Sequence, residues 1–222
     1  MIIGLLQVLF VFVAASAPPA GTIKVKDYYV DKTEILNVHW DEYVRLKGKD
    51  LTPDEVTLLL PYTPNQVYSL PENRFKPVVL ITYEQALEYC QWRSEVVSKR
   101  YNRKITYRLP TPQEWQEIAQ ELLISEASQA QKDLKDTQKM MAKRDGAYTL
   151  LTTENPKEKL YHLMDNVSEM TSKKGVAMGL NNYDLYKLNG DAASEALLKT
   201  STYSEPHPYM GFRCVAVVGK GF

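Results

Sequence analysis

In the stretch Thr106–Trp115, "TYRLPTPQEW", apolar and polar residues first alternate, and residues typical of a helix N-terminus then follow directly. Thr111 can accept a hydrogen bond from the helix N-terminus, and Glu114 completes a capping box with it. Pro112 fits the first helical position because its missing N–H would be unpaired there. The stretch therefore predicts a strand that passes at once into a helix, with Trp115 in the first turn.

The same capping pattern occurs twice earlier in the chain, as "TPDE" at Thr52–Glu55 and as "TYEQ" at Thr82–Gln85. The second copy opens "YEQALEYCQWRSEVVSKRY", in which apolar residues recur at helical spacing. That spacing predicts a long helix that turns Cys90 toward a core.

Other elements are expected on both sides of this helix. Alternation predicts a strand at Ile23–Val30, and Asn37 is the expected cap of a helix that Gly48 ends. Further strands are expected in "AYTLLTT", residues 147–153, and in the terminal "GFRCVAVV". A polar helical insertion is expected around residues 124–145, and little regular structure between residues 154 and 209. The expected content of regular structure is therefore low.

The composition is typical of a globular chain without a strong electrostatic field. Of the 222 residues, 44% are apolar and 24% charged, with 27 acidic and 27 basic side chains. No global field therefore draws the chain to nucleic acid or an acidic surface, and a polyanion partner is disfavoured. The length suits a single domain, expected at residues 21–222.

The N-terminus, "MIIGLLQVLFVFVAASA", is apolar and uncharged and ends in the small residues Ala15-Ser16-Ala17. The run is shorter than the roughly 20 residues of a membrane span, so residues 1–20 are interpreted as a secretory signal, with an uncleaved membrane anchor as the alternative. We expect an exported protein that is periplasmic, membrane-associated or on the cell surface.

The chain has two cysteines, Cys90 and Cys214. In an oxidising compartment an isolated pair far apart in sequence is more often a structural disulfide than a redox or metal site. The alternative is two free thiols, one of them a nucleophile.

Four segments in order carry a family resemblance: "KDYYVDKTEILNVHWDEYVR", "PVVLITYEQALEYCQWRSE" running on to "YRLPTPQEWQEIA", "LYHLMDNVSEMTS" and "GFRC". Together they resemble the formylglycine-generating enzyme (sulfatase-modifying factor) family. The resemblance implies a C-type-lectin-related α+β fold, structural roles for Arg108 and Trp115, and a disulfide between Cys90 in "YC" and Cys214 in "GFRC".

The chemistry of that family is not retained in the sequence. Its oxidising members carry two active-site cysteines shortly before "GFRC", at a spacing that can hold copper(I). Here that loop is "NGDAASEALLKTSTYSEPHPYM", without cysteine. Another branch uses histidine-held iron, but His39, His162 and His207 show no ligand spacing. We therefore expect neither copper nor iron, and no catalytic or cofactor-binding residue is assigned.

Calcium is a better candidate than a redox metal. The family's "GNVWEW" turn presents an amide, backbone carbonyls and a carboxylate to this hard cation. The corresponding residues here are Asn166, Val167 and Glu169. The alternative is that Asn166 and Glu169 stabilise the turn by hydrogen bonds alone.

The sequence thus favours a non-catalytic binding or scaffolding protein of the bacterial cell envelope, with another envelope protein as partner and a gliding or secretion assembly as its setting by family analogy. One alternative is an oxidoreductase of the family with an unrecognised site in the C-terminal loops. The other is a lectin-like glycan binder that uses residues such as Asn181, Asn182 and Tyr183.

Overall fold

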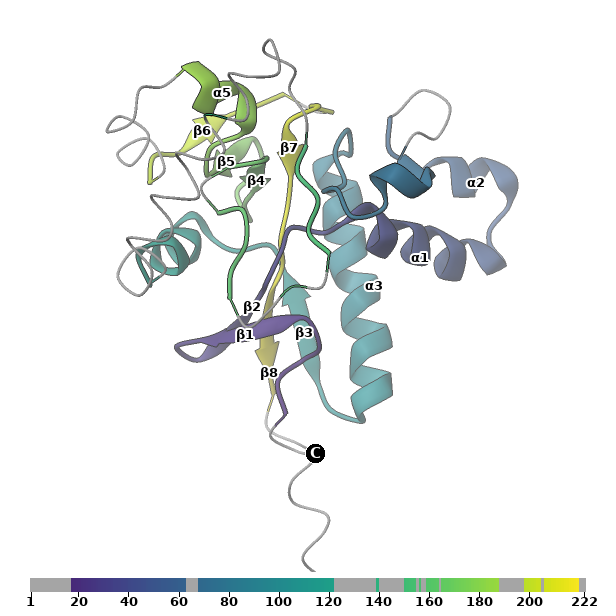
Figure 1. Cartoon of the computed structure of the whole chain (residues 1–222). Helices are drawn as coiled ribbons and strands as arrows, with labels where there is room; N and C mark the ends of the chain where they lie inside the picture. Colours follow the sequence, from purple (N-terminus) through teal and green to yellow (C-terminus); the bar gives the residue numbers. More distant parts are fainter. Residues whose placement is uncertain are drawn as a thin grey trace, which may run out of the picture.

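The computed structural model describes residues 17–62, 68–121, 139, 150–154, 156, 159–163, 165–187, 198–204 and 206–219. Two four-stranded sheets and several helices form a mixed α+β fold (Figure 1). Within the described part, no helix is long and apolar enough to cross a membrane. The apolar run at residues 1–16 and, apart from Lys139, the predicted insertion at 124–145 lie outside the described residues.

The first sheet has the order β1-β2-β8-β3, and all its neighbours are antiparallel. It consists of β1 (Thr22–Val25), β2 (Tyr28–Asp31), β8 (Val215–Val218) and β3 (Ile105–Arg108). The single strand predicted at Ile23–Val30 was wrong, because the chain reverses there into a β1–β2 hairpin. Lys26 takes the left-handed conformation at this reversal, with φ of 52°.

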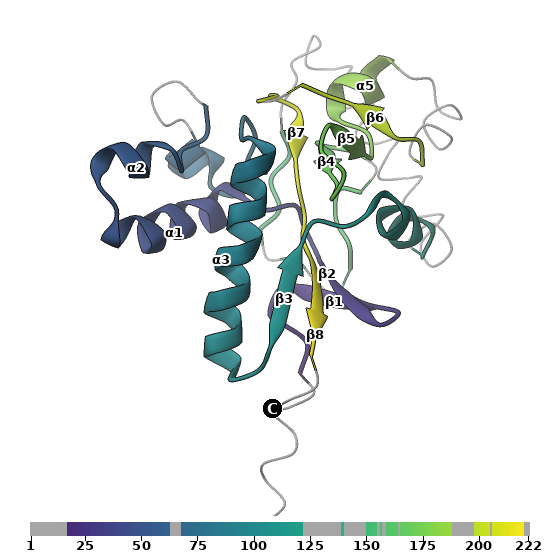
Figure 2. The same cartoon turned by 180° about the vertical axis from the view of Figure 1, so that it is seen from behind.

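The long helix α3 (Tyr83–Tyr101) packs beside β3, as Figures 1 and 2 show. Its predicted capping box is confirmed: the Gln85 N–H donates to the Thr82 hydroxyl at 3.1 Å, and the Thr82 N–H donates to the Gln85 side chain at 2.8 Å. Cys90 lies on the buried face, as the helical spacing predicted.

The other capping predictions had mixed outcomes. Thr52 caps the short helix α2 (Pro53–Thr57), and Thr111 caps the helical residues 112–121 through Glu114. The prediction for α1 (Asn37–Lys47) was wrong at its start, because Leu36 is the cap. Gly48 ends α1 as expected and opens the 3-10 turn η1 (Gly48–Asp50).

The second sheet is built from very short strands in the order β6-β5-β4-β7. These are β6 (Ser201–Thr202), β5 (Val176–Met178), β4 (Ser168–Met170) and β7 (Met210–Gly211), with the short helix α5 (Asn182–Lys187) nearby (Figure 1). The strand predicted in "AYTLLTT" is not found in its described part. Residues 150–153 form no strand, and the Thr153 N–H donates instead to the carbonyl of Phe75.

Two clusters of buried apolar side chains form the core. The first is centred on aromatic rings, with the Trp40 centroid 5.5 Å from Tyr89 and 6.2 Å from Phe212. The second surrounds Trp115 and Leu163. Val30 of β2 belongs to the second cluster and Ile35 to the first, and the chain between them carries Asp31 and Glu34 of the candidate site.

Candidate functional site

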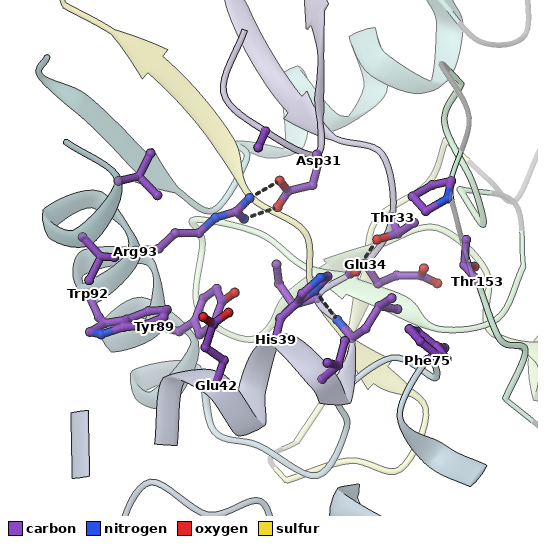
Figure 3. A pocket seen from close by; sticks show the side chains of 18 of the residues that line it. Asp31, Thr33, Glu34, His39, Glu42, Phe75, Tyr89, Trp92, Arg93 and Thr153 are labelled. Atoms are coloured by element: carbon purple, nitrogen blue, oxygen red, sulfur yellow. Dashed lines mark hydrogen bonds and ion pairs between the residues drawn. The ribbon is translucent and has the colours of Figure 1, made fainter. Parts of the chain in front are cut away.

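A pocket of about 500 Å³ lies between α1 and α3 (Figure 3). Helical spacing places its walls, since His39 and Glu42 stand one turn apart on α1 and Trp92 and Arg93 lie on the facing side of α3. The segment that joins β2 to α1 closes the inner end. The pocket therefore combines apolar walls with several charged groups, as binding pockets often do.

A buried ion pair forms one side of the pocket. The Arg93 guanidinium donates to both oxygens of Asp31, at 2.7 and 2.8 Å, and lies 4.0 Å from the centroid of the Tyr107 ring. The backbone N–H of Cys214 donates to the same carboxylate at 2.9 Å. Both groups are thus fixed and neutralise each other, so this side of the pocket presents no unpaired charge to a ligand.

Glu34 lies at the inner end of the pocket and is completely buried. One carboxylate oxygen accepts a hydrogen bond from the Asn166 amide at 2.9 Å, while Oε2 has no partner among the described residues. Burial raises the pKa of Glu34 to about 7, against the opposing charges of His162 and Arg213. This carboxyl group therefore titrates near neutral pH.

Thr153 adds a second buried oxygen in need of a partner. Its hydroxyl has no hydrogen bond within the described part of the chain, and Figure 3 shows it on the same side of the pocket as Glu34. Buried polar atoms usually have partners, so two unsatisfied oxygens at one pocket single out this end. A group that donates hydrogen bonds would complement both.

A second buried ion pair, Glu169–Arg213, lies behind this end. Arg213 donates from Nε at 2.7 Å and from a terminal nitrogen at 2.6 Å, and the Trp115 indole donates to the same carboxylate at 2.8 Å. Arg213 also donates to the carbonyls of Asp31 and Tyr161. Trp115 and Arg213 thus connect Glu169 of β4 to the segments that contain Asp31 and Tyr161. Arg108 pairs with Glu114 and likewise has a structural contact.

The three residues predicted to hold calcium lie in one turn whose polar side chains already have protein partners. Asn166 has a φ of 73°, donates to Glu34, and accepts from the Leu151 N–H at 2.7 Å. Glu169 accepts from Arg213 and Trp115, and Val167 is buried. Among the described residues no group of three His, Cys, Asp or Glu side chains is placed to hold a metal. Calcium binding stays a prediction beside the alternative of a hydrogen-bonded turn.

The two cysteines lie side by side in the core as free thiols, with 3.4 Å between their sulfur atoms. Both are buried, and burial, together with the neighbouring Cys90, raises the pKa of the Cys214 thiol. A buried, protonated thiol is a poor nucleophile and metal ligand. The structure brings together the pair named for a disulfide, and the bond itself stays a prediction.

The three histidines have separate local partners. The N–H of Leu36 donates to Nδ1 of His39, and the N–H of Tyr209 donates to Nδ1 of His207. His162 lies 2.8 Å from the Asp165 carboxylate. Burial lowers the pKa of His162, but the Asp165 carboxylate outweighs it and raises the pKa to about 9.

The asparagines considered for glycan binding serve the fold. Asn181 donates to Ser168 and Asp184 and accepts from the Asp184 N–H, so its amide is fully used. The Asn182 side chain accepts from the N–H of Asn166 at 2.7 Å. The Tyr183 ring is stacked on that of Tyr209, with 5.9 Å between centroids.

Sequence reasoning missed the pocket and its principal groups, Asp31, Glu34, Arg93 and Thr153. Asp31 and Arg93 are 62 residues apart, and no local pattern links them. Glu34 had one available signal, its place in "KDYYVDKTEILNVHW", the first segment of the family resemblance.

Comparison with known proteins gives a clear family result. The family described as "Sulfatase-modifying factor enzyme 1-like domain" (FGE-sulfatase) matches residues 7–218. Among solved structures, PvdO from Pseudomonas aeruginosa is similar, with 12% identity, a TM-score of 0.42, and coverage of 86% of this chain and 80% of that one. No curated protein matches the chain. The family match covers nearly the whole described fold, and the chain belongs to the formylglycine-generating enzyme-like, sulfatase-modifying factor family, with its C-type-lectin-like α+β fold.

Proposed function

We propose that this chain is a non-catalytic member of its family, exported to the bacterial cell envelope, where it acts as a binding or scaffolding protein. One observation carries the proposal: the only two cysteines of the chain are buried against each other in the core. Oxidation of a substrate thiol by the family's chemistry needs reachable cysteines, and these residues do not fit a copper site.

The pocket supports the binding role. Its unsatisfied oxygens on Glu34 and Thr153 lie between apolar walls, an arrangement that suits recognition of a hydrogen-bond donor. The partner we propose is another envelope protein, in an assembly of the kind that serves gliding or secretion. Calcium at Asn166, Val167 and Glu169 belongs to the same proposal, and it would have to share the Glu169 carboxylate with Arg213.

A second candidate is an enzyme with an unrecognised site. The observation that favours it is Glu34, whose pKa of about 7 suits a general acid or base at neutral pH. A lectin-like role has less support, because Asn181 and Asn182 are used within the fold.

Two experiments test the proposal together. Purified protein is incubated with a cysteine-containing peptide, oxygen, and copper or iron, and the mass of the peptide is then measured by mass spectrometry. We expect no conversion above the protein-free reaction, whereas conversion that is lost in Glu34→Gln would establish the enzyme. In parallel, a photo-crosslinking residue replaces Glu42 at the pocket, or Lys173 as the control. A defined protein adduct from position 42 alone is expected, and equal adducts or none at both positions would contradict a binding role for the pocket.

Calcium is tested by titration into chelator-treated protein while thermal unfolding is followed. Binding should add roughly 2.7 kcal/mol at 100 times the dissociation constant. An unchanged unfolding temperature at saturating calcium would leave only the hydrogen-bonded turn.

A further inference from the structure

The turn between α3 and β3 carries an unusual density of positive charge. Its six residues Lys99–Lys104, "KRYNRK", contain four cationic side chains. No acidic residue occurs from Val96 to Tyr107. Because the whole chain has no net charge, this is a local asymmetry and not part of a general basic character.

Two other parts of the chain meet this turn and add no acidic side chain. The Gly219 N–H at the end of β8 donates to the Lys104 carbonyl at 2.9 Å. Ala20 and Gly21, near the start of the described chain, line the same pocket as Arg100. Figures 1 and 2 show the α3–β3 turn, the end of β8 and the first described residues at one end of the molecule. Ala20, Gly21 and Gly219 thus add no negative charge to this end, and the acidic residues nearest to it are Glu95, one turn before Lys99 on α3, and Glu42, which lines the same pocket as Arg100.

The side chains of Lys99, Arg100 and Lys104, which we call the basic end, are available at the surface. All three residues are exposed, and none forms an ion pair with a described residue. Some other cations of the protein are engaged in pairs, such as Lys47 with Glu88 and Lys174 with Glu84. Tyr101 lies within the same turn and is 38% exposed. The turn thus combines free cations with an amphipathic ring.

The chain that precedes this end suggests what the cations meet. Residues 1–17 contain no charged side chain and are almost wholly apolar. In the sequence they precede Ala20 and Gly21, which line the same pocket as Arg100. Clusters of Lys and Arg next to an apolar segment are attracted to anionic lipid headgroups, and tyrosine favours the interface between water and hydrocarbon. We infer that Lys99, Arg100 and Lys104 dock this end of the domain onto an anionic phospholipid surface. The inference rests on the proposed envelope role, and it takes residues 1–20 as the uncleaved membrane anchor rather than as a cleaved signal.

The test uses the full chain with vesicles of phosphatidylcholine, with and without phosphatidylglycerol. The measured quantity is the ratio of the two partition coefficients, because the apolar N-terminal segment contributes to both. Each basic residue at an anionic surface is worth about fivefold in partitioning, so Lys99→Glu, Arg100→Glu and Lys104→Glu together should lower the ratio by at least 100-fold or so. Raising the salt from about 0.1 M to about 1 M should lower the wild-type ratio as well, since the Debye length falls from about 10 Å to about 3 Å.

A matched control reverses three other exposed lysines, Lys49, Lys173 and Lys199, and so produces the same change in net charge. This control should lose far less than the basic-end variant. As a second readout, Tyr101→Cys is labelled with an environment-sensitive dye, which should shift to shorter emission wavelength only with phosphatidylglycerol. The buried Cys90 and Cys214 should not compete for the dye.

Equal ratios for the wild type and the basic-end variant would overturn the inference, as would an equal loss in the control. Both results would assign the cations to another acidic partner or to none. Neither result touches the proposed non-catalytic role, which the peptide assay tests separately.

Discussion

The two sheets of this protein are held in place by different forces. The first sheet has four strands of four residues each, and α3 packs against it through an aromatic and aliphatic core. The second sheet has strands of two or three residues, too short to be secured by their ladder bonds alone. Around it, buried side-chain hydrogen bonds from Asn166, Asn181 and Arg213 supply the missing connections.

This difference indicates which region tolerates substitutions without a large loss of stability. The first region depends mainly on apolar volume and helix caps, which many residues can satisfy, and its one described long-range ion pair joins Asp31 of β2 to Arg93 of α3. The second depends on particular polar atoms meeting across long stretches of sequence, such as Glu34 and Asn166, which are 132 residues apart. We expect single substitutions to have larger and less local effects in the second region.

The largest effect is expected at the buried ion pair. Arg213→Met leaves the Glu169 carboxylate buried without its partner and should lower the free energy of unfolding by about 3–5 kcal/mol. Urea unfolding measures it. Lys174→Met, which breaks an exposed pair with Glu84, is the control and should cost under about 1 kcal/mol. Similar losses in both variants would refute the distinction between buried and surface pairs.

The next effect tests the turn at Asn166. Asn166→Ala removes the partners of Glu34 and of the Leu151 N–H and places a Cβ-bearing residue without a hydrogen-bonding side chain at a φ of 73°. The expected loss is about 2–4 kcal/mol. Asn166→Gly keeps the conformation but not the hydrogen bonds, so thermal unfolding of both variants separates strain from bonding. If the glycine variant were as stable as the wild type, the hydrogen bonds would be unimportant.

Glu34 predicts a pH dependence of stability. Its pKa in the folded protein, about 7, is above the ordinary 4.5, so the folded state binds the proton more tightly. Stability from this group is full below pH 4.5 and is lost as the pH rises through about 7, by an amount on the order of 3 kcal/mol. Glu34→Gln, which resembles the protonated form, should remove this fall in unfolding measurements across the range.

The charged groups near Glu34 are His162, Arg213 and Glu169. Among them, His162 provides an internal check on the pH dependence assigned to Glu34. His162, with a pKa raised from 6.5 to about 9, should give a separate fall between those pH values that persists in Glu34→Gln. A wild-type curve that stays parallel to that of Glu34→Gln between pH 4.5 and 7 would argue against the raised pKa of Glu34.

The smallest effect tests the caps of the first region. Thr82→Ala removes the acceptor for the Gln85 N–H and should cost about 1 kcal/mol. Thr52→Ala should cost less, because α2 has no buried residue and its loss disturbs little packing. Chemical denaturation of the two variants, compared with Thr82→Ser, tests the order; a larger loss at Thr52 would reverse our view of α2.

The sequence predicted the parts of the fold that depend on neighbours in the chain. The capping boxes at Thr82 and Thr111 were correct because both partners lie within three residues. The β1–β2 hairpin was missed because its turn uses Lys26 in a conformation that usually marks glycine or asparagine. The α1 cap was misplaced because Asn37 bonds to Asn73, a residue far along the chain.

The candidate site was harder to predict for the same reason. Its ion pair joins Asp31 to Arg93, and its unsatisfied oxygens belong to Glu34 and Thr153, from segments that meet only in the folded chain. The cysteines were an exception, because the family words "YC" and "GFRC" marked a long-range pair, and the structure does place Cys90 beside Cys214.

The most direct test of the central claim, that the family's thiol chemistry is absent, is alkylation of the native protein followed by intact-mass measurement. We predict that neither Cys90 nor Cys214 is modified in the folded protein. We also predict that neither reacts after unfolding without reductant, because the predicted disulfide joins them. Modification of both only after unfolding would disprove the disulfide but keep the claim. Rapid modification of either cysteine in the native state would contradict the account and point to a reactive thiol.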